Sequence, residues 1–125
     1  MFKLKFFAFF MLVVLLNSCS KEVVKENLIK EKNLELQVIE AYQEGVEALE
    51  SGDVLFAAKK FNEAEILFPQ GEWAPKSSLM ASYSYYIQDY YGDAIAELER
   101  FIVVYPLHKD LQYAYYLLAI CHYEQ

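Results

Sequence analysis

The chain repeats itself with a period of 37 residues, and this repeat constrains the fold more than any other feature. Small residues and prolines recur in register at that spacing: Gly45, Ser82 and Ala119; Ala57 and Ala94; Pro69 and Pro106. A fixed period of roughly 20 to 50 residues marks stacked repeats, in which each unit buries its apolar face against its neighbours. We therefore expect a repeat protein.

Each unit has the pattern of two antiparallel helices. In the first unit, Gly52 is suited to end one helix and Asp53 to cap the next. The apolar stripe of the second helix includes Phe61, and Pro69 ends that helix. The order of small and large residues is that of tetratricopeptide repeats. The sequence predicts an all-α tetratricopeptide-repeat solenoid of about two and a half repeats, with helices at 37–51, 54–68, 75–88, 92–105 and 111–125.

The second unit and its flanks carry a narrower series of motifs: Tyr85-Tyr86, Ala94-Ile95, Arg100-Phe101-Ile102, Pro106-Leu107-His108 and the aromatic run Tyr113 to Tyr116. In this order they resemble the BamD family of outer-membrane assembly lipoproteins, over about Ala41 to the end. Two positions depart from the family pattern. Lys109 follows the histidine where the family commonly has proline, and the aspartate of the second inter-helix turn is shifted to Asp89.

The resemblance also implies further repeats after Gln125. The sequence is therefore expected to be a truncated copy or a fragment, and its last helix to lack its partner. In that case Ala119, Ile120 and Cys121 would have no covering helix.

The first 19 residues have the organisation of a lipoprotein signal peptide. Lys3 and Lys5 precede an unbroken apolar run of 11 residues, Phe6–Leu16, which as a helix reaches about 16 Å, roughly half a bilayer core. Leu16-Asn17-Ser18-Cys19 resembles the bacterial lipobox, and Ser20 resembles the outer-membrane sorting signal; the alternative is an ordinary signal peptide with a coincidental cysteine. The predicted divisions are 1–18 (signal peptide), 19–36 (lipidated Cys19 and charged tether) and 37–125 (repeat domain).

Charge and motif content exclude several classes of function. From Gln37 to the end there are 14 acidic and five basic side chains, a surface that repels nucleic acid. No phosphate-binding loop, paired-cysteine metal motif or nucleophile elbow occurs, so we predict neither an enzyme nor a bound cofactor. His108 is expected to hydrogen-bond backbone, and Arg100 to lie in surface charge or pair with a neighbouring helix. Cys121 is expected to be a buried apolar residue, which disfavours a hydrolase using Cys121 and His122.

Tyrosine is abundant, at 11 residues. In stacked helix pairs the first helix of each pair lines the concave side, so the repeat register groups certain residues there. The predicted partner-binding residues, which we call the tyrosine wall, are Tyr42, Leu79, Tyr83, Tyr86, Tyr113 and Tyr116. They offer flat apolar faces and hydroxyl groups. Packing between helices is the alternative role for each of them, with Leu79 the strongest candidate for the core.

The resemblance implies a lipid-anchored periplasmic scaffold at the outer membrane. Its expected partners are the Omp85-type barrel assembly subunit, other assembly lipoproteins, and unfolded β-barrel proteins, with the membrane contacted through the lipid. The alternative is another periplasmic repeat lipoprotein, an adaptor in cell-wall synthesis and division.

Overall fold

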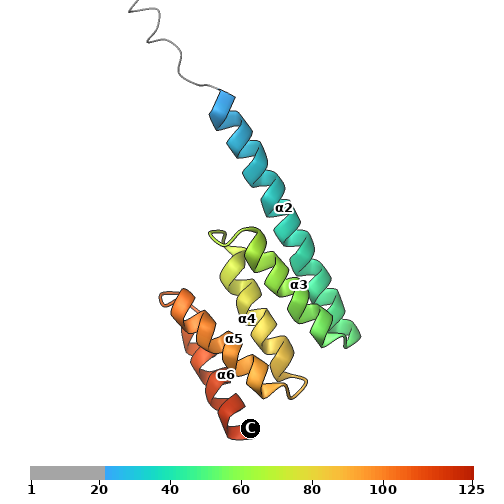
Figure 1. Ribbon diagram of the computed structural model, residues 1–125, viewed down its shortest axis with the longest axis vertical. Coiled ribbons are helices and arrows are strands. Elements are labelled where there is room, and N and C mark those ends of the chain that lie inside the picture. The colour runs from blue at the N-terminus through green and yellow to red at the C-terminus, as the bar shows by residue number, and fades with distance from the viewer. Residues whose placement is uncertain (1–21) are drawn as a thin grey trace, which may run out of the picture. The chain divides into compact units, whose positions relative to one another are not determined.

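The computed structural model describes residues 22–125, with side chains from residue 32 onward; the expected signal peptide and Cys19 lie outside these residues. The described residues form five α-helices and no strand: α2 (Glu22–Ser51), α3 (Val54–Leu67), α4 (Trp73–Tyr86), α5 (Tyr91–Val104) and α6 (Leu111–Glu124) (Figure 1). This confirms the all-α helix-pair solenoid. The chain divides into two units, Met1–Lys32 and Asn33–Gln125, and the repeats lie in the second.

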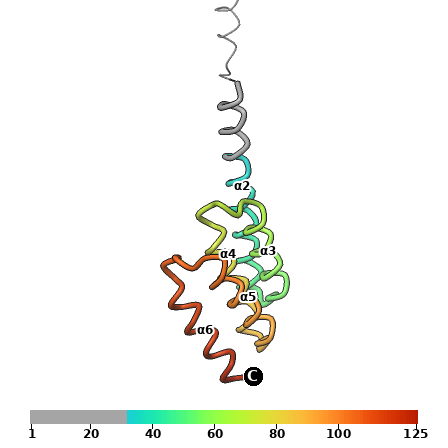
Figure 2. The backbone as a smooth tube through the Cα atoms, turned by 60° about the vertical axis from the view of Figure 1, so that its left-hand side comes forward, coloured from blue at the N-terminus to red at the C-terminus, as the bar shows by residue number. Residues whose placement is uncertain are grey.

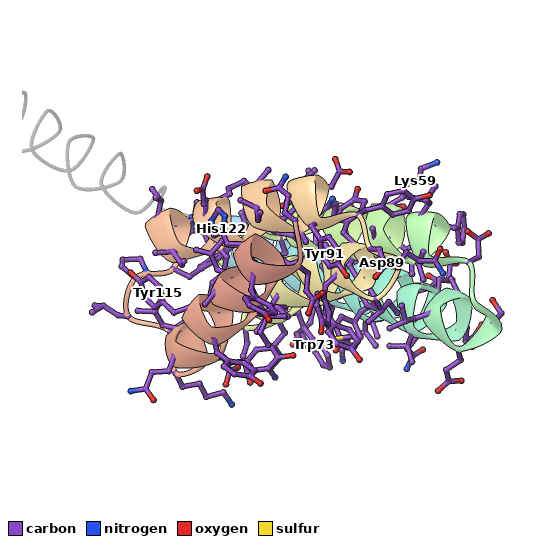
Figure 3. All side chains as sticks on the ribbon, turned by 90° about the horizontal axis from the view of Figure 1, so that it is seen from below. Lys59, Trp73, Asp89, Tyr91, Tyr115 and His122 are labelled. Atoms are coloured by element: carbon purple, nitrogen blue, oxygen red, sulfur yellow. The ribbon has the colours of Figure 1, made fainter. Side chains whose placement is uncertain are left out.

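Consecutive helices of the repeat unit alternate in direction, so their connections gather at two edges (Figures 1 and 2). We call the edge with the α3–α4 and α5–α6 connections, residues 66–76 and 103–111, the loop edge. The opposite edge, residues 47–56 and 87–93, is the turn edge. In Figure 3, α4 and α6 lie on the side of Trp73, whereas α3 and α5 lie on the side of Lys59. The helices therefore form two layers.

The turn chemistry expected from the sequence is present. Gly52 has a φ of +85°, a left-handed conformation that glycine adopts without steric cost. Asp53 then caps α3, and its carboxylate accepts a hydrogen bond from the backbone N–H of Phe56 at 3.2 Å. Pro69 and Pro106 each lie just beyond a helix end, as predicted.

One predicted helix start was wrong. α2 begins at Glu22 rather than at residue 37, whereas α4 begins at Trp73, two residues before the predicted start and within the usual margin for a helix boundary. The segment before residue 37 contains neither proline nor glycine, and its Glu–Lys spacing supports a helix that needs no apolar stripe once the packed part has formed. Pro75 occupies the first turn of α4, where its missing N–H leaves no intrahelical bond unmade.

The interior depends on close contact between the two helices of a pair. A Cβ added at Gly45 would stand 2.8 Å from Cε1 of Phe61, whose side chain is fully buried. Trp73 packs against the ring of Tyr42 at 5.0 Å between centroids, and so joins the first helix of one pair to the first helix of the next. This confirms the small-residue register at Gly45.

The expectation that Cys121 lacks cover was wrong. Cys121 is fully buried and belongs to the core cluster that contains Leu98 and Phe101 of α5. It faces the preceding helix pair, whereas Ala119 faces outward and is exposed. No helix in the described part of the chain is both long enough and apolar enough to span a membrane.

Candidate binding surface

A hollow of about 490 Å³ opens on the layer that contains α2, α4 and α6. It is lined by Tyr42, Lys76, Leu79, Met80, Tyr83, Asp110 and Tyr113. Four members of the tyrosine wall therefore meet at one site, although they come from three helices that are separated by about one repeat each. This grouping follows from the register, because equivalent positions of successive first helices lie side by side.

Tyr42 closes one side of the hollow and is held by core packing. Its ring meets Phe61 edge-on at 5.2 Å and Trp73 at 5.0 Å between centroids. Burial raises the pKa of Tyr42, and the charge of Lys76 partly offsets this. Tyr42 therefore combines the packing role with a place in the hollow.

On α4, Leu79 is 9% exposed and belongs to the core, so it contributes only its edge to the hollow. Tyr83 lies beside it and packs on the same core. Tyr86 lies outside the hollow but continues the aromatic row, 6.2 Å from Tyr83 and 6.2 Å from Tyr91 between ring centroids.

The α6 residues of the wall are more open. Tyr113 is 43% exposed and Tyr116 is 63% exposed, with 6.5 Å between their ring centroids. Burial raises the pKa of Tyr113, and the neighbouring Tyr83 contributes to the same shift. Tyr116 lies outside the hollow and extends the aromatic surface along α6.

Three lining residues were missed by sequence reasoning: Lys76, Met80 and Asp110. Lys76 precedes Leu79 by three residues and Tyr83 by seven, so helical periodicity places all three on one face. Its ammonium lies 4.8 Å from the centroid of the Trp73 ring and 3.1 Å from a carboxylate oxygen of Glu72. The hollow thus contains a cation, a carboxylate, phenol hydroxyls and apolar ring faces, a set that suits a peptide with a polar terminus.

The candidate reactive residues have structural roles. The backbone N–H of Asp110 donates to Nδ1 of His108 at 3.3 Å, which confirms the expected backbone contact, and the His108 ring lies edge-on to Phe101 at 5.8 Å. Burial raises the pKa of the Cys121 thiol, which disfavours the nucleophilic thiolate. Among the residues whose side chains are described, no three His, Cys, Asp or Glu side chains form a metal-binding group.

A larger hollow, of about 770 Å³, lies along α3 and α5 and includes the loop-edge residues Ile66 and Val104. Its charged groups already satisfy one another. Arg100 donates to both oxygens of Glu65 and to Glu97, and the hydroxyl of Tyr105 donates to Glu65 at 2.7 Å. This confirms that Arg100 pairs with a neighbouring helix, and it leaves the smaller hollow as the stronger candidate for peptide binding.

Comparison with known proteins places the sequence in a family. Residues 35–125 match the YfiO family model, described as outer membrane lipoprotein. The "outer membrane protein assembly factor BamD" of Caulobacter vibrioides is 37% identical over 108 residues, which cover 86% of this chain and 34% of that protein. The BamD of Rickettsia prowazekii is 34% identical over 82 residues, which cover 66% of this chain and 33% of that protein. The BamD of Neisseria gonorrhoeae is 34% identical over 79 residues, which cover 63% of this chain and 30% of that protein. The chain thus spans about a third of the length of these relatives. It belongs to the BamD (YfiO) family of outer membrane lipoproteins.

Proposed function

We propose that this protein is a lipid-anchored periplasmic scaffold in outer-membrane β-barrel assembly, and that the tyrosine wall binds extended segments of unfolded barrel proteins. The observation that carries the binding proposal is the hollow in which Tyr42, Tyr83 and Tyr113 converge. Family membership supports the assembly role, since the relatives are named assembly factors. The proposed partners are an Omp85-type barrel subunit and other assembly lipoproteins.

The chemistry of the client matches this surface. Strands of membrane barrels alternate apolar and polar residues and are flanked by aromatic girdles, so an unfolded segment offers one apolar face and an unpaired backbone. Rigid tyrosine rings provide apolar contact at a small cost in side-chain entropy, and their hydroxyls accept from or donate to a peptide backbone. Lys76 adds a positive charge suited to a C-terminal carboxylate. Ordering a disordered strand offsets much of the contact energy, so we expect micromolar or weaker affinity.

Site-specific photo-crosslinking in cells tests the client proposal. A photoreactive phenylalanine at Tyr83 should crosslink to newly exported barrel proteins. The same group at Tyr115, which is 53% exposed and outside the hollow, provides the matched control. Equal crosslinking at the two positions, or none at Tyr83 in a folded and exported protein, would argue against binding at the wall.

The anchor and the assembly role need separate tests. Cys19→Ala should leave the precursor uncleaved at that site and remove the lipid label from the protein. Membrane retention of this variant after proven signal cleavage would contradict the lipobox interpretation. Co-purification separates the two candidate roles. Recovery of the barrel subunit supports the assembly role, and recovery of cell-wall enzymes without it supports the adaptor in cell-wall synthesis and division.

A further inference from the structure

Four apolar side chains project from the loop edge. Their exposed fractions are 74% for Ile66, 78% for Val103, 51% for Val104 and 98% for Leu107. Ile66 and Val103 are 37 residues apart, so the repeat places them at equivalent points of α3 and α5. Ile66 and Val104 border one continuous hollow, so these two lie side by side, and Val103 and Leu107 belong to the same inter-helix connection as Val104. Grouped apolar exposure of this kind marks a contact surface.

The turn edge also exposes apolar side chains, but its charge is different. Five acidic residues and no lysine or arginine lie within its two segments: Glu47, Glu50, Asp53, Asp89 and Asp93. In the two segments of the loop edge, Glu72 and Asp110 are balanced by Lys76 and Lys109. An anionic bilayer surface repels an acidic edge and tolerates a neutral one. The difference in charge therefore favours the loop edge over the turn edge for contact with lipid.

The chain also enters the repeats at the loop edge. The part of α2 that belongs to the repeat unit begins at Asn33, and Val38 and Ala41 in this part pack with Leu67 and Phe68, where α3 ends. Asn33 is only 14 positions after Cys19. Residues 22–33 of this segment belong to α2, so the segment spans about 21 Å when it is helical throughout. A lipid on Cys19 therefore keeps the loop edge near the bilayer.

We propose that the loop edge rests on the bilayer surface, with Ile66, Val103 and Leu107 inserted among the lipid headgroups. The inference rests on the proposed lipid anchor at Cys19 and adds a second contact to it. The acylated cysteine that the family resemblance implies is a firm anchor by itself, so the second contact adds orientation rather than attachment. With this edge on the lipid, the helix axes of the repeats point away from the bilayer plane, and the tyrosine wall stays open to the periplasm.

The test uses the full lipidated chain in vesicles with about three parts phosphatidylethanolamine to one part anionic phosphatidylglycerol. Leu107→Cys and, as the matched control, the turn-edge variant Gln88→Cys are each labelled with an environment-sensitive dye. Because Cys121 is buried and Cys19 is acylated, the new thiol takes the label. Lipids brominated on their acyl chains should quench the dye at residue 107 and leave the dye at residue 88 unquenched.

A second pair of variants shows whether the patch causes the contact. In the labelled Leu107→Cys protein, Ile66→Ser with Val103→Ser should lower quenching by about half or more, because most of the remaining apolar contact is removed. Leu55→Ser with Phe56→Ser at the turn edge should leave it unchanged; these two residues are also exposed, at 55% and 42%. Circular dichroism confirms that each variant is folded.

The outcomes separate this inference from the proposed function. Protein that floats with vesicles but shows no quenching at residue 107, or equal quenching at both labels, overturns the edge contact and leaves the anchor intact. Wild-type protein that fails to float overturns the anchor and the edge contact together. Patch-dependent capture of a protein partner, without quenching, assigns the patch to that partner and also overturns the lipid contact.

Discussion

Arg100 on α5 donates two hydrogen bonds, of 2.8 and 2.7 Å, to the two carboxylate oxygens of Glu65 on α3. Glu65 is only 6% exposed, and it also accepts from the hydroxyl of Tyr105. The hydrogen bond to Glu65 raises the pKa of Arg100, which keeps the guanidinium charged. This pair links the second helices of the two repeats.

Removing the arginine should therefore destabilise the fold. Arg100→Ala leaves the Glu65 carboxylate without its charged partner, and we expect a loss of about 1–3 kcal/mol in unfolding free energy, less than for a fully buried pair because the Arg100 side chain is 41% exposed. Thermal unfolding followed by circular dichroism measures the change. Glu99→Ala, at an exposed position of the same helix, is the control. If the two variants had the same melting temperature, the Arg100–Glu65 pair would have no measurable role in stability.

Alkaline pH should weaken the same region. Burial and the hydrogen bond to Glu65 raise the pKa of Tyr105 far above its ordinary value of 10.0. The neutral phenol is thus favoured in the folded state, so its contribution is complete below about pH 10 and is lost as the pH rises above that value. Tyr105→Phe should make the decline in stability above pH 10 shallower than in the wild type. Parallel denaturant titrations from pH 8 to 11 measure this, and identical pH profiles for the two proteins would contradict it.

Two glycines provide a matched test of helix packing. A Cβ at Gly45 meets the ring of Phe61 at 2.8 Å, whereas a Cβ at Gly92 meets nothing within 4 Å. Gly45→Ala should cost about 1–3 kcal/mol because the buried ring must shift. Gly92→Ala should be neutral or stabilising by up to about 1 kcal/mol, since alanine loses less backbone entropy on folding. Equal midpoints in chemical denaturation would show that the two helices separate without cost.

The sequence predicted the architecture well because the repeat, the turn at Gly52-Asp53 and the two prolines are local signals. Prediction from the sequence failed where burial depends on packing between residues that are far apart in the sequence. Nothing near Glu65 in the sequence marks it as buried, because its partners are 35 and 40 residues away. The early start of α2 was missed because its first residues have no apolar stripe, and a helix that extends from a packed segment needs none.

The wall was predictable for the same reason as the fold, since register alone brings Tyr42, Tyr83 and Tyr113 together. Lys76 was missed because a charged residue on a helix face does not differ in sequence from ordinary surface charge. Asp110 precedes α6, where an acidic side chain is common at a helix start, so sequence alone does not separate capping from binding.

The ammonium group of Lys76 should bind the C-terminal carboxylate of a bound peptide. Lys76→Ala should weaken binding of a barrel-protein C-terminal peptide by about three- to tenfold, or roughly 0.7–1.4 kcal/mol. The same peptide with an amidated C-terminus should bind wild type and variant alike. The comparison of the free-acid and amide peptides by calorimetry isolates the charge. An equal loss for both peptides would instead show that Lys76 acts through its packing on Trp73.

Calorimetric titration of an aromatic-ended barrel-protein peptide tests the central claim most directly. Tyr83→Ala/Tyr113→Ala should weaken binding at least about tenfold, since double truncation removes two of the three rings around the hollow. Tyr115→Ala, on the opposite face of α6 from Tyr113, should bind as the wild type does. Circular dichroism must show that all three proteins retain their helices. Unchanged affinity in a folded double variant would contradict the account and assign these tyrosines to helix packing alone.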